Sequence, residues 1–183
     1  METTQTQPVT TNPVVSIPAG SIPIPTAYAT LGVVTGYNPP SADKLRLFIV
    51  ALSGRGKTTF VSSDRNSIIL DYEDGANAIP KGTAARLNIS TPEAHEQIIT
   101  RLIADGKANN RTYSRVVIDT IDGLIELVGG KFASEQGLEH FSEYGSKGAG
   151  YAIVRNRLWS DIVALEGAGY AWTIVGHLAE KTI

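Results

Sequence analysis

Residues 51–58 read Ala-Leu-Ser-Gly-Arg-Gly-Lys-Thr and directly follow an apolar run over residues 45–50. Two glycines in so short a loop allow the backbone to curl until successive N–H groups point inward at phosphate oxygens. The lysine that follows brings a positive charge to such a loop, and the next hydroxyl is a ligand for Mg²⁺. A helix that begins at the lysine adds the positive end of its dipole. The spacing therefore predicts a loop that binds the phosphates of a nucleotide.

We expect this loop to supply seven nucleotide-binding residues, namely Ser53, Gly54, Arg55, Gly56, Lys57, Thr58 and Thr59. Lys57 should reach the β- and γ-phosphates, which also gives it a part in catalysis, and Thr58 should ligate the metal. Ala51 stands where phosphate-binding loops of this kind usually have their first glycine, and relaxed forms of this loop motif admit a small residue there. The alternative is a glycine-rich turn with an exposed lysine.

Three more polar side chains follow apolar runs further along the chain. Glu73 follows Ile-Leu-Asp-Tyr, Asp119 ends Val-Val-Ile-Asp, and His177 follows Thr-Ile-Val-Gly. If these runs are parallel strands of one sheet, their carboxyl ends lie at the same edge as the loop, which is where such sheets bind ligands. We therefore expect the three side chains to converge on the phosphate site.

Each of these residues has a chemical role that suits this position. Asp119 is the expected Mg²⁺ ligand, usually through a coordinated water, and the alternative is a helix cap. Glu73 is the expected base that orients water toward the γ-phosphate, whereas Asp71 and Asp74 are assigned to a strand end and a turn; the alternative is a solvated acidic turn. His177 is the expected γ-phosphate sensor, and the alternative is a structural histidine.

From Lys44 onward, strand-like runs alternate with helical stripes, which predicts an α/β fold with a mostly parallel sheet and helices on both faces. The expected strands are Leu45–Val50, Ser67–Tyr72, Ala85–Ile89, Ser114–Ile118 and Tyr170–Val175. Helices are expected over 58–63, from Thr91 to near Gly106, from Ile121 to Phe132 and over 154–165, with a glycine-rich loop over 137–150. Trp159 and Trp172 are assigned to the core, and His95 and His140 to the surface without a role.

Composition limits the function classes. The chain has 183 residues, 42% of them hydrophobic, and a net charge of −2, so we expect one domain with a real core and no overall attraction to nucleic acid or membranes. The absence of cysteine excludes disulfides and thiol catalysis and favours a cytoplasmic location.

Seven of the nine prolines fall in residues 1–42, which excludes a membrane helix there. This segment is predicted to be a Thr/Pro-rich, mostly disordered tail, with an edge strand within Ile22–Tyr37 as the alternative. Residues 43–183 then form the domain.

The loop, Glu73, Asp119 and His177, in this order, resemble the RecA-like branch of P-loop ATPases from Lys44 to the C-terminus. In that branch the catalytic glutamate follows the strand after the loop helix, the Walker B acid precedes Ser or Thr, and a polar sensor ends a later strand. Only about eight residues separate Lys57 from the second strand. This short helix is similar to the compact ATP-binding proteins of bacteriophages that take part in single-strand annealing and recombination. The resemblance implies Mg²⁺-dependent ATP hydrolysis, self-association and action on single-stranded DNA.

The resemblance also implies a DNA contact in Glu139–Tyr151, with Tyr144 or Tyr151 stacking on a base and phosphate contacts from Lys147, Arg155 and Arg157. The alternative for this segment is a flexible connector. RecA-like cores continue well past the sensor strand, so a chain that ends at Ile183 is expected to be shortened at its C-terminal side. Two other functions remain open. One is a small P-loop kinase, which would need an arginine-rich lid, and the other is a nucleotide-dependent assembly module without turnover.

Overall fold

The computed structural model describes residues 44–73 and 84–178 of the chain. The tail expected over residues 1–42 and the turn at Asp74 lie outside these residues. Five parallel strands form one sheet in the order β1-β5-β4-β2-β3. The strands are β1 (Leu47–Ala51), β2 (Ser67–Asp71), β3 (Ala85–Asn88), β4 (Arg115–Asp119) and β5 (Ala171–His177).

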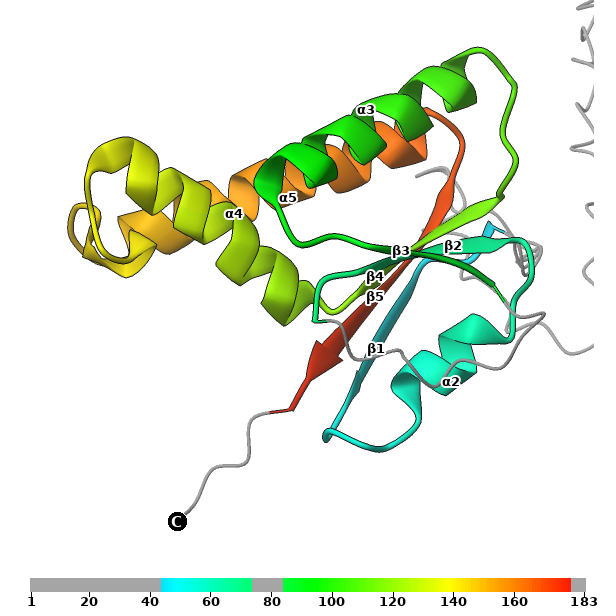
Figure 1. The fold of residues 1–183 in the computed structure, drawn as a ribbon, viewed down its shortest axis with the longest axis horizontal. Coiled ribbons are helices and arrows are strands. Elements are labelled where there is room, and N and C mark those ends of the chain that lie inside the picture. The colour runs from blue at the N-terminus through cyan, green and yellow to red at the C-terminus, as the bar shows by residue number, and fades with distance from the viewer. Residues whose placement is uncertain (1–43, 74–83, 179–183) are drawn as a thin grey trace, which may run out of the picture. The chain divides into compact units, whose positions relative to one another are not determined.

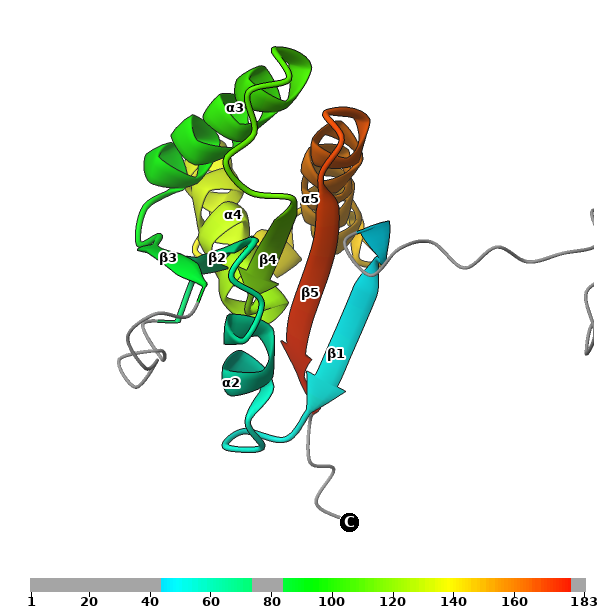
Figure 2. The same ribbon diagram turned by 90° about the vertical axis from the view of Figure 1, so that its right-hand side faces the viewer.

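The helices cover both faces of the sheet unequally. The short α2 (Lys57–Ser62) lies on one face, and three long helices lie on the other (Figures 1 and 2): α3 (Pro92–Lys107), α4 (Ile121–Gln136) and α5 (Ala149–Gly167). The 3₁₀ turn η2 (Phe141–Glu143) lies in the predicted glycine-rich loop. The prediction of an α/β fold with a parallel sheet between helices is therefore confirmed. Among the described residues, no helix is both long enough and apolar enough to cross a membrane.

The two faces of the sheet bury separate apolar clusters. Val117 and Val175 pack with Val61 on the α2 side, whereas Ile118 and Ile174 pack against α4 and α5. Every residue of β2 and β4 is buried, as expected for strands covered on both faces. The core thus holds β2 and β4 rigidly up to their carboxyl ends.

The edge of the sheet differs from the sequence-based expectation. The apolar run before the loop predicts a buried strand, but within the described residues β1 pairs with β5 alone, and Phe48 is 62% exposed. The strand also begins at Leu47 instead of Leu45. Its outward-facing side chains therefore form part of the surface, although its carboxyl end still leads into the glycine-rich loop.

One of the two tryptophan assignments needs correction. Trp159 is 54% exposed, because α5 buries the face that contains Leu158 and Ile162, and Trp159 lies beside this face. Trp172 does pack against the core, as predicted.

His95 is buried and only 4% exposed, so its assignment to the surface is wrong. Its Nε2 lies 3.2 Å from Asp161 Oδ2, and its Nδ1 lies 2.8 Å from the hydroxyl of Tyr72. A carboxylate only accepts, so Nε2 carries the proton and Nδ1 accepts from the tyrosine. Burial raises the pKa of Tyr72, which keeps this donor protonated. The bonds tie α3 and α5 to the residue that follows β2.

Phe141 determines how α5 begins. This side chain is 1% exposed and packs between α4 and α5. A Cβ atom at Gly150 would lie 1.7 Å from the carbonyl oxygen of Phe141, and one at Gly129 would lie 2.3 Å from its ring. Both helices therefore need glycine where they approach this residue.

We predict that Gly150→Ala destabilises the protein by about 1–3 kcal/mol, because the added methyl group meets the backbone carbonyl of Phe141. This backbone cannot move away without shifting the buried Phe141 side chain. Gly130→Ala is the matched control. A Cβ there meets nothing within 4 Å, and the change should stabilise the helix by roughly 0.5–1 kcal/mol. Thermal or urea unfolding of both variants measures the difference. Equal stability of the two would contradict the packing described for Phe141.

Candidate active site

The loop between β1 and α2 has the backbone that phosphate binding requires. Gly54 and Gly56 have φ angles of 72° and 77°, in the left-handed region that glycine adopts most readily. Gly56 is the N-cap of α2 and contributes no side chain to the loop. Lys57 is 8% exposed, and its Nζ donates to the carbonyl oxygen of Ala51 at 2.8 Å and to that of Leu52 at 3.0 Å. The lysine thus folds back across the loop, and the alternative of an exposed lysine is wrong.

Thr58 and Asp119 meet although 61 residues separate them in the sequence. The Thr58 hydroxyl donates to Asp119 Oδ2 at 2.7 Å, and Asp119 is 4% exposed at the end of β4. Burial raises the pKa of Asp119; the charges of Asp71 and Glu73 act in the same direction, whereas the Thr58 bond and Lys57 act against it. A hydroxyl and a carboxylate held this close form a donor set that suits Mg²⁺.

Glu73 is held beside this pair by several contacts. Its backbone N–H donates to Asp71 Oδ1 at 3.1 Å, and its carboxylate accepts a hydrogen bond from the Thr120 hydroxyl. The Thr120 oxygen also accepts from the N–H of Gly123, so Thr120 is the N-cap of α4 and Asp119 is not. Asp71 pairs with Asp119 in the register of β2 and β4, which brings Glu73 to the same edge. Glu73 is therefore held at this edge by hydrogen bonds, while its residue remains exposed to solvent, as the alternative of a solvated acidic turn also expects.

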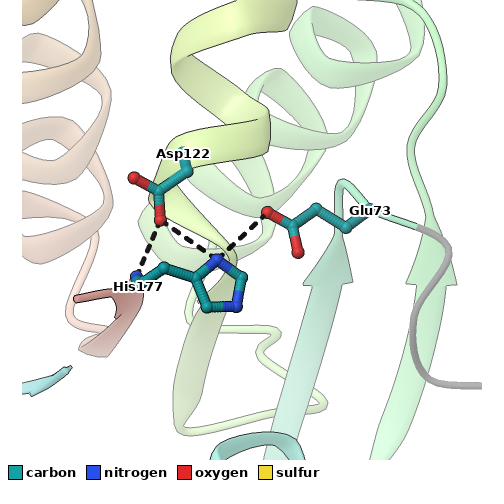
Figure 3. Close-up of side chains that lie close together, drawn as sticks. All are labelled: Glu73, Asp122 and His177. Atoms are coloured by element: carbon teal, nitrogen blue, oxygen red, sulfur yellow. Dashed lines mark hydrogen bonds and ion pairs between the residues drawn. The ribbon is translucent and has the colours of Figure 1, made fainter. Parts of the chain in front are cut away.

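His177 reaches the site because β5 lies between β1 and β4. In the register, His177 pairs with Ala51, at the start of the loop. Its Nδ1 lies 3.6 Å from Glu73 Oε1 and 3.5 Å from Asp122 Oδ2, and its backbone N–H donates to the same Asp122 oxygen at 2.8 Å (Figure 3). The imidazole thus stands between two carboxylates.

These residues line a single cleft of about 310 Å³. Its walls contain every residue expected to bind the nucleotide or the metal, together with both other predicted catalytic residues: Ser53, Gly54, Arg55, Gly56, Lys57, Thr58, Thr59, Glu73, Asp119 and His177. Asp71 and Thr120 complete the lining. A buried cation, a glycine-rich loop and a hydroxyl–carboxylate pair fit a nucleotide triphosphate with its Mg²⁺.

The residues predicted to contact DNA lie elsewhere. Lys147 and Arg155 line a separate groove between α4, α5 and β1, beside Tyr151, Trp159 and Phe48. This groove does not share a lining residue with the nucleotide cleft.

Arg157, the third residue of this predicted set, is not part of the groove lining. It lies 3.9 Å from Glu135 of α4. Arg157 therefore lies apart from Lys147 and Arg155.

Three further residues of the site were not predicted in these roles. Thr120 is a partner of Glu73, Asp122 is a partner of His177, and Arg86 of β3 pairs with the buried carboxylate of Asp71. Thr120 directly follows Asp119 and Asp122 comes two residues later, so both could have been inferred from their position at the start of a helix. The partner of Arg86 could not, since nothing in the local sequence connects it to Asp71.

The sheet, the loop and the hydroxyl–carboxylate pair define a P-loop NTPase. A family model described as an AAA domain matches residues 43–183, and the chain belongs to this P-loop NTPase family. A comparison with curated proteins found no match. Membership of the family implies a nucleotide ligand and leaves the finer activity to be inferred from the site.

We predict that Asp119→Asn raises the unfolding temperature of the nucleotide-free protein at neutral pH. The raised pKa of Asp119 means that folding opposes its ionisation, and the amide removes this cost while it still accepts from Thr58. In the parent, this loss of stability is absent below the unfolded-state pKa, where Asp119 is protonated in both states. It grows as pH rises and is fully present above the folded-state pKa. The difference between the two proteins should therefore shrink in acid, and calorimetry over a pH series measures it. A variant less stable than the parent at pH 7 would contradict this description of Asp119.

Proposed function

We propose that this chain is a Mg²⁺-dependent ATPase of the RecA-like type that acts on single-stranded DNA. The hydrolytic part is supported above all by Glu73, a carboxylate held in the cleft by Thr120 and by its own backbone bond to Asp71. A base has to be fixed at this position to orient a water toward the γ-phosphate.

The side chains of the cleft divide the work. The loop N–H groups and Lys57 bind the phosphates, with Lys57 exchanging its bonds to the loop carbonyls for phosphate oxygens. Thr58 and Asp119 hold Mg²⁺, which neutralises charge on the phosphates. Glu73 orients the attacking water and accepts its proton, and His177 contacts the γ-phosphate from the adjacent strand.

Two substitutions separate binding from turnover. Lys57→Ala should abolish productive ATP binding because it removes the buried positive charge of the loop. Glu73→Gln should keep ATP affinity and lower turnover by about 10²–10⁴-fold, the usual contribution of a positioned base. Nucleotide titration and phosphate release measure the two effects, with Lys107→Ala and Glu126→Gln, which are exposed, as controls. Parental hydrolysis by Glu73→Gln would show that the base is elsewhere.

The proposed action on DNA is supported by the groove on α5. Tyr151 and Trp159 are exposed aromatic side chains on which bases can stack, and Lys147 and Arg155 lie beside them as partners for phosphates. A chain of net charge −2 needs such a local combination to hold a polyanion. The groove is also strongly apolar, which favours a second candidate function, nucleotide-dependent assembly with other copies of the chain.

We predict that Lys147→Ala with Arg155→Ala weakens single-stranded DNA binding and leaves ATP affinity unchanged. Loss of two phosphate contacts should reduce the salt dependence of binding, the slope of log K against log salt, by about 1.4, at about 0.7 per contact. Fluorescence titrations at several salt concentrations measure this slope. Lys107→Ala with Arg65→Ala removes the same charge from exposed sites outside the groove and is the control. Absence of DNA affinity at low salt, with ATP-driven self-association in light scattering, would favour the assembly function instead.

A further inference from the structure

Asp122 makes more contacts within the site than are expected for an acidic residue in the first turn of a helix. It lies in the first turn of α4, and the cap of this helix is already supplied by Thr120. A single oxygen, Asp122 Oδ2, accepts the backbone N–H of His177 at 2.8 Å and lies 3.5 Å from the imidazole Nδ1. One carboxylate therefore holds both the end of β5 and the ring that this end carries.

The imidazole separates two like charges. The ligand atoms of Glu73, Asp122 and His177 all lie within 4.8 Å of one another, so the two carboxylates would repel each other if the ring turned away. Carboxylates only accept, so this position favours the tautomer with its proton on Nδ1, which lies 3.6 Å from Glu73 Oε1 and 3.5 Å from Asp122 Oδ2. This arrangement favours the ring position seen in Figure 3 over rotation into solvent.

The position of the ring leaves one nitrogen for the nucleotide. Nε2 lies on the side of the ring turned away from Asp122 (Figure 3), and His177 lines the same cleft as the phosphate-binding loop. With Nδ1 held by the carboxylates, Nε2 is the ring nitrogen left to meet a phosphate. The orientation of His177 toward the cleft thus depends on Asp122.

We propose that Asp122 is a positioning residue for hydrolysis, which fixes His177 between Glu73 and the phosphates of the bound nucleotide. This inference rests on the proposed ATPase function. Asp122 acts through His177, and its carboxylate is not expected to bind the nucleotide or the metal.

Asp122→Asn tests this inference, because the amide oxygen still accepts the backbone N–H of His177 while the charge that holds the ring is lost. We expect kcat to fall by about 10-fold, because the ring loses the carboxylate beside its Nδ1, with unchanged ATP affinity and unchanged Mg²⁺ dependence. Glu126→Gln, an exposed acid on the same helix, is the control and should keep the parental kcat. An equal loss of ATP affinity, or a shifted Mg²⁺ requirement, would overturn the inference, and the shift would indicate a metal site.

A double-mutant comparison separates positioning from a general structural effect. In a His177→Ala background the ring is absent, so Asp122→Asn should change kcat by less than 2-fold, an additivity test for contacting residues. A full additional loss would overturn the inference. If Asp122→Asn does not fold, Asp122→Ser replaces it in both backgrounds, because serine is a neutral residue that is also favoured at the start of a helix.

The outcomes for the two proposals remain distinct. Turnover by the parent above that of Lys57→Ala supports the ATPase function by itself. If the parent turns over and Asp122→Asn turns over equally fast, only the role of Asp122 fails. If the parent does not hydrolyse ATP, the proposed function fails and this inference fails with it.

Discussion

The parallel pairing of β5 between β1 and β4 is the constraint on which the site depends. It brings three segments that are far apart in sequence to one edge of the sheet, because parallel strands present their carboxyl ends together. The register pairs His177 with the start of the loop and Asp119 with Asp71. A slip of one residue in any of these pairs would turn a polar side chain toward the opposite face. The buried rows of β2 and β4 prevent such a slip.

This convergence also concentrates negative charge. Asp71, Glu73, Asp119 and Asp122 all come to one end of the sheet, and the charges of Asp71 and Glu73 add to the effect of burial, which is the main cause of the raised pKa of Asp119. The protein offsets the charge locally: Arg86 pairs with Asp71, and His177 lies between Glu73 and Asp122. Among the described residues, the Asp119 carboxylate accepts its hydrogen bond from a neutral hydroxyl, while the charge of Lys57 lowers its pKa from a greater distance. A buried carboxylate with a raised pKa is suited to bind a cation, and groups with such shifted pKa values are typical of functional sites.

The sequence predicts the site well wherever its signal is local or follows from strand order. The residues around Lys57 share one short loop, and Asp119 ends an apolar run, so both could be placed from spacing alone. The errors concern tertiary contacts. His95 is buried because Tyr72 and Asp161 are its partners, and nothing near it in sequence indicates either.

The same limit applies to exposure and to distant pairs. The side on which Trp159 lies depends on which flank of α5 meets the sheet, and the exposure of Phe48 depends on which strand lies at the edge. Asp122 and His177 are 55 residues apart, so their contact follows from the fold and not from a motif.

The most direct test of the central claim, that these strand ends build one nucleotide site, is a crystal structure of the chain with Mg²⁺ and a non-hydrolysable ATP analogue. We predict phosphate oxygens on the N–H groups of residues 54–58, the metal bound by the Thr58 hydroxyl with Asp119 behind it, and the Glu73 carboxylate facing the γ-phosphate across a water. A nucleotide bound outside this cleft, or a γ-phosphate beyond the reach of Glu73, would contradict the claim.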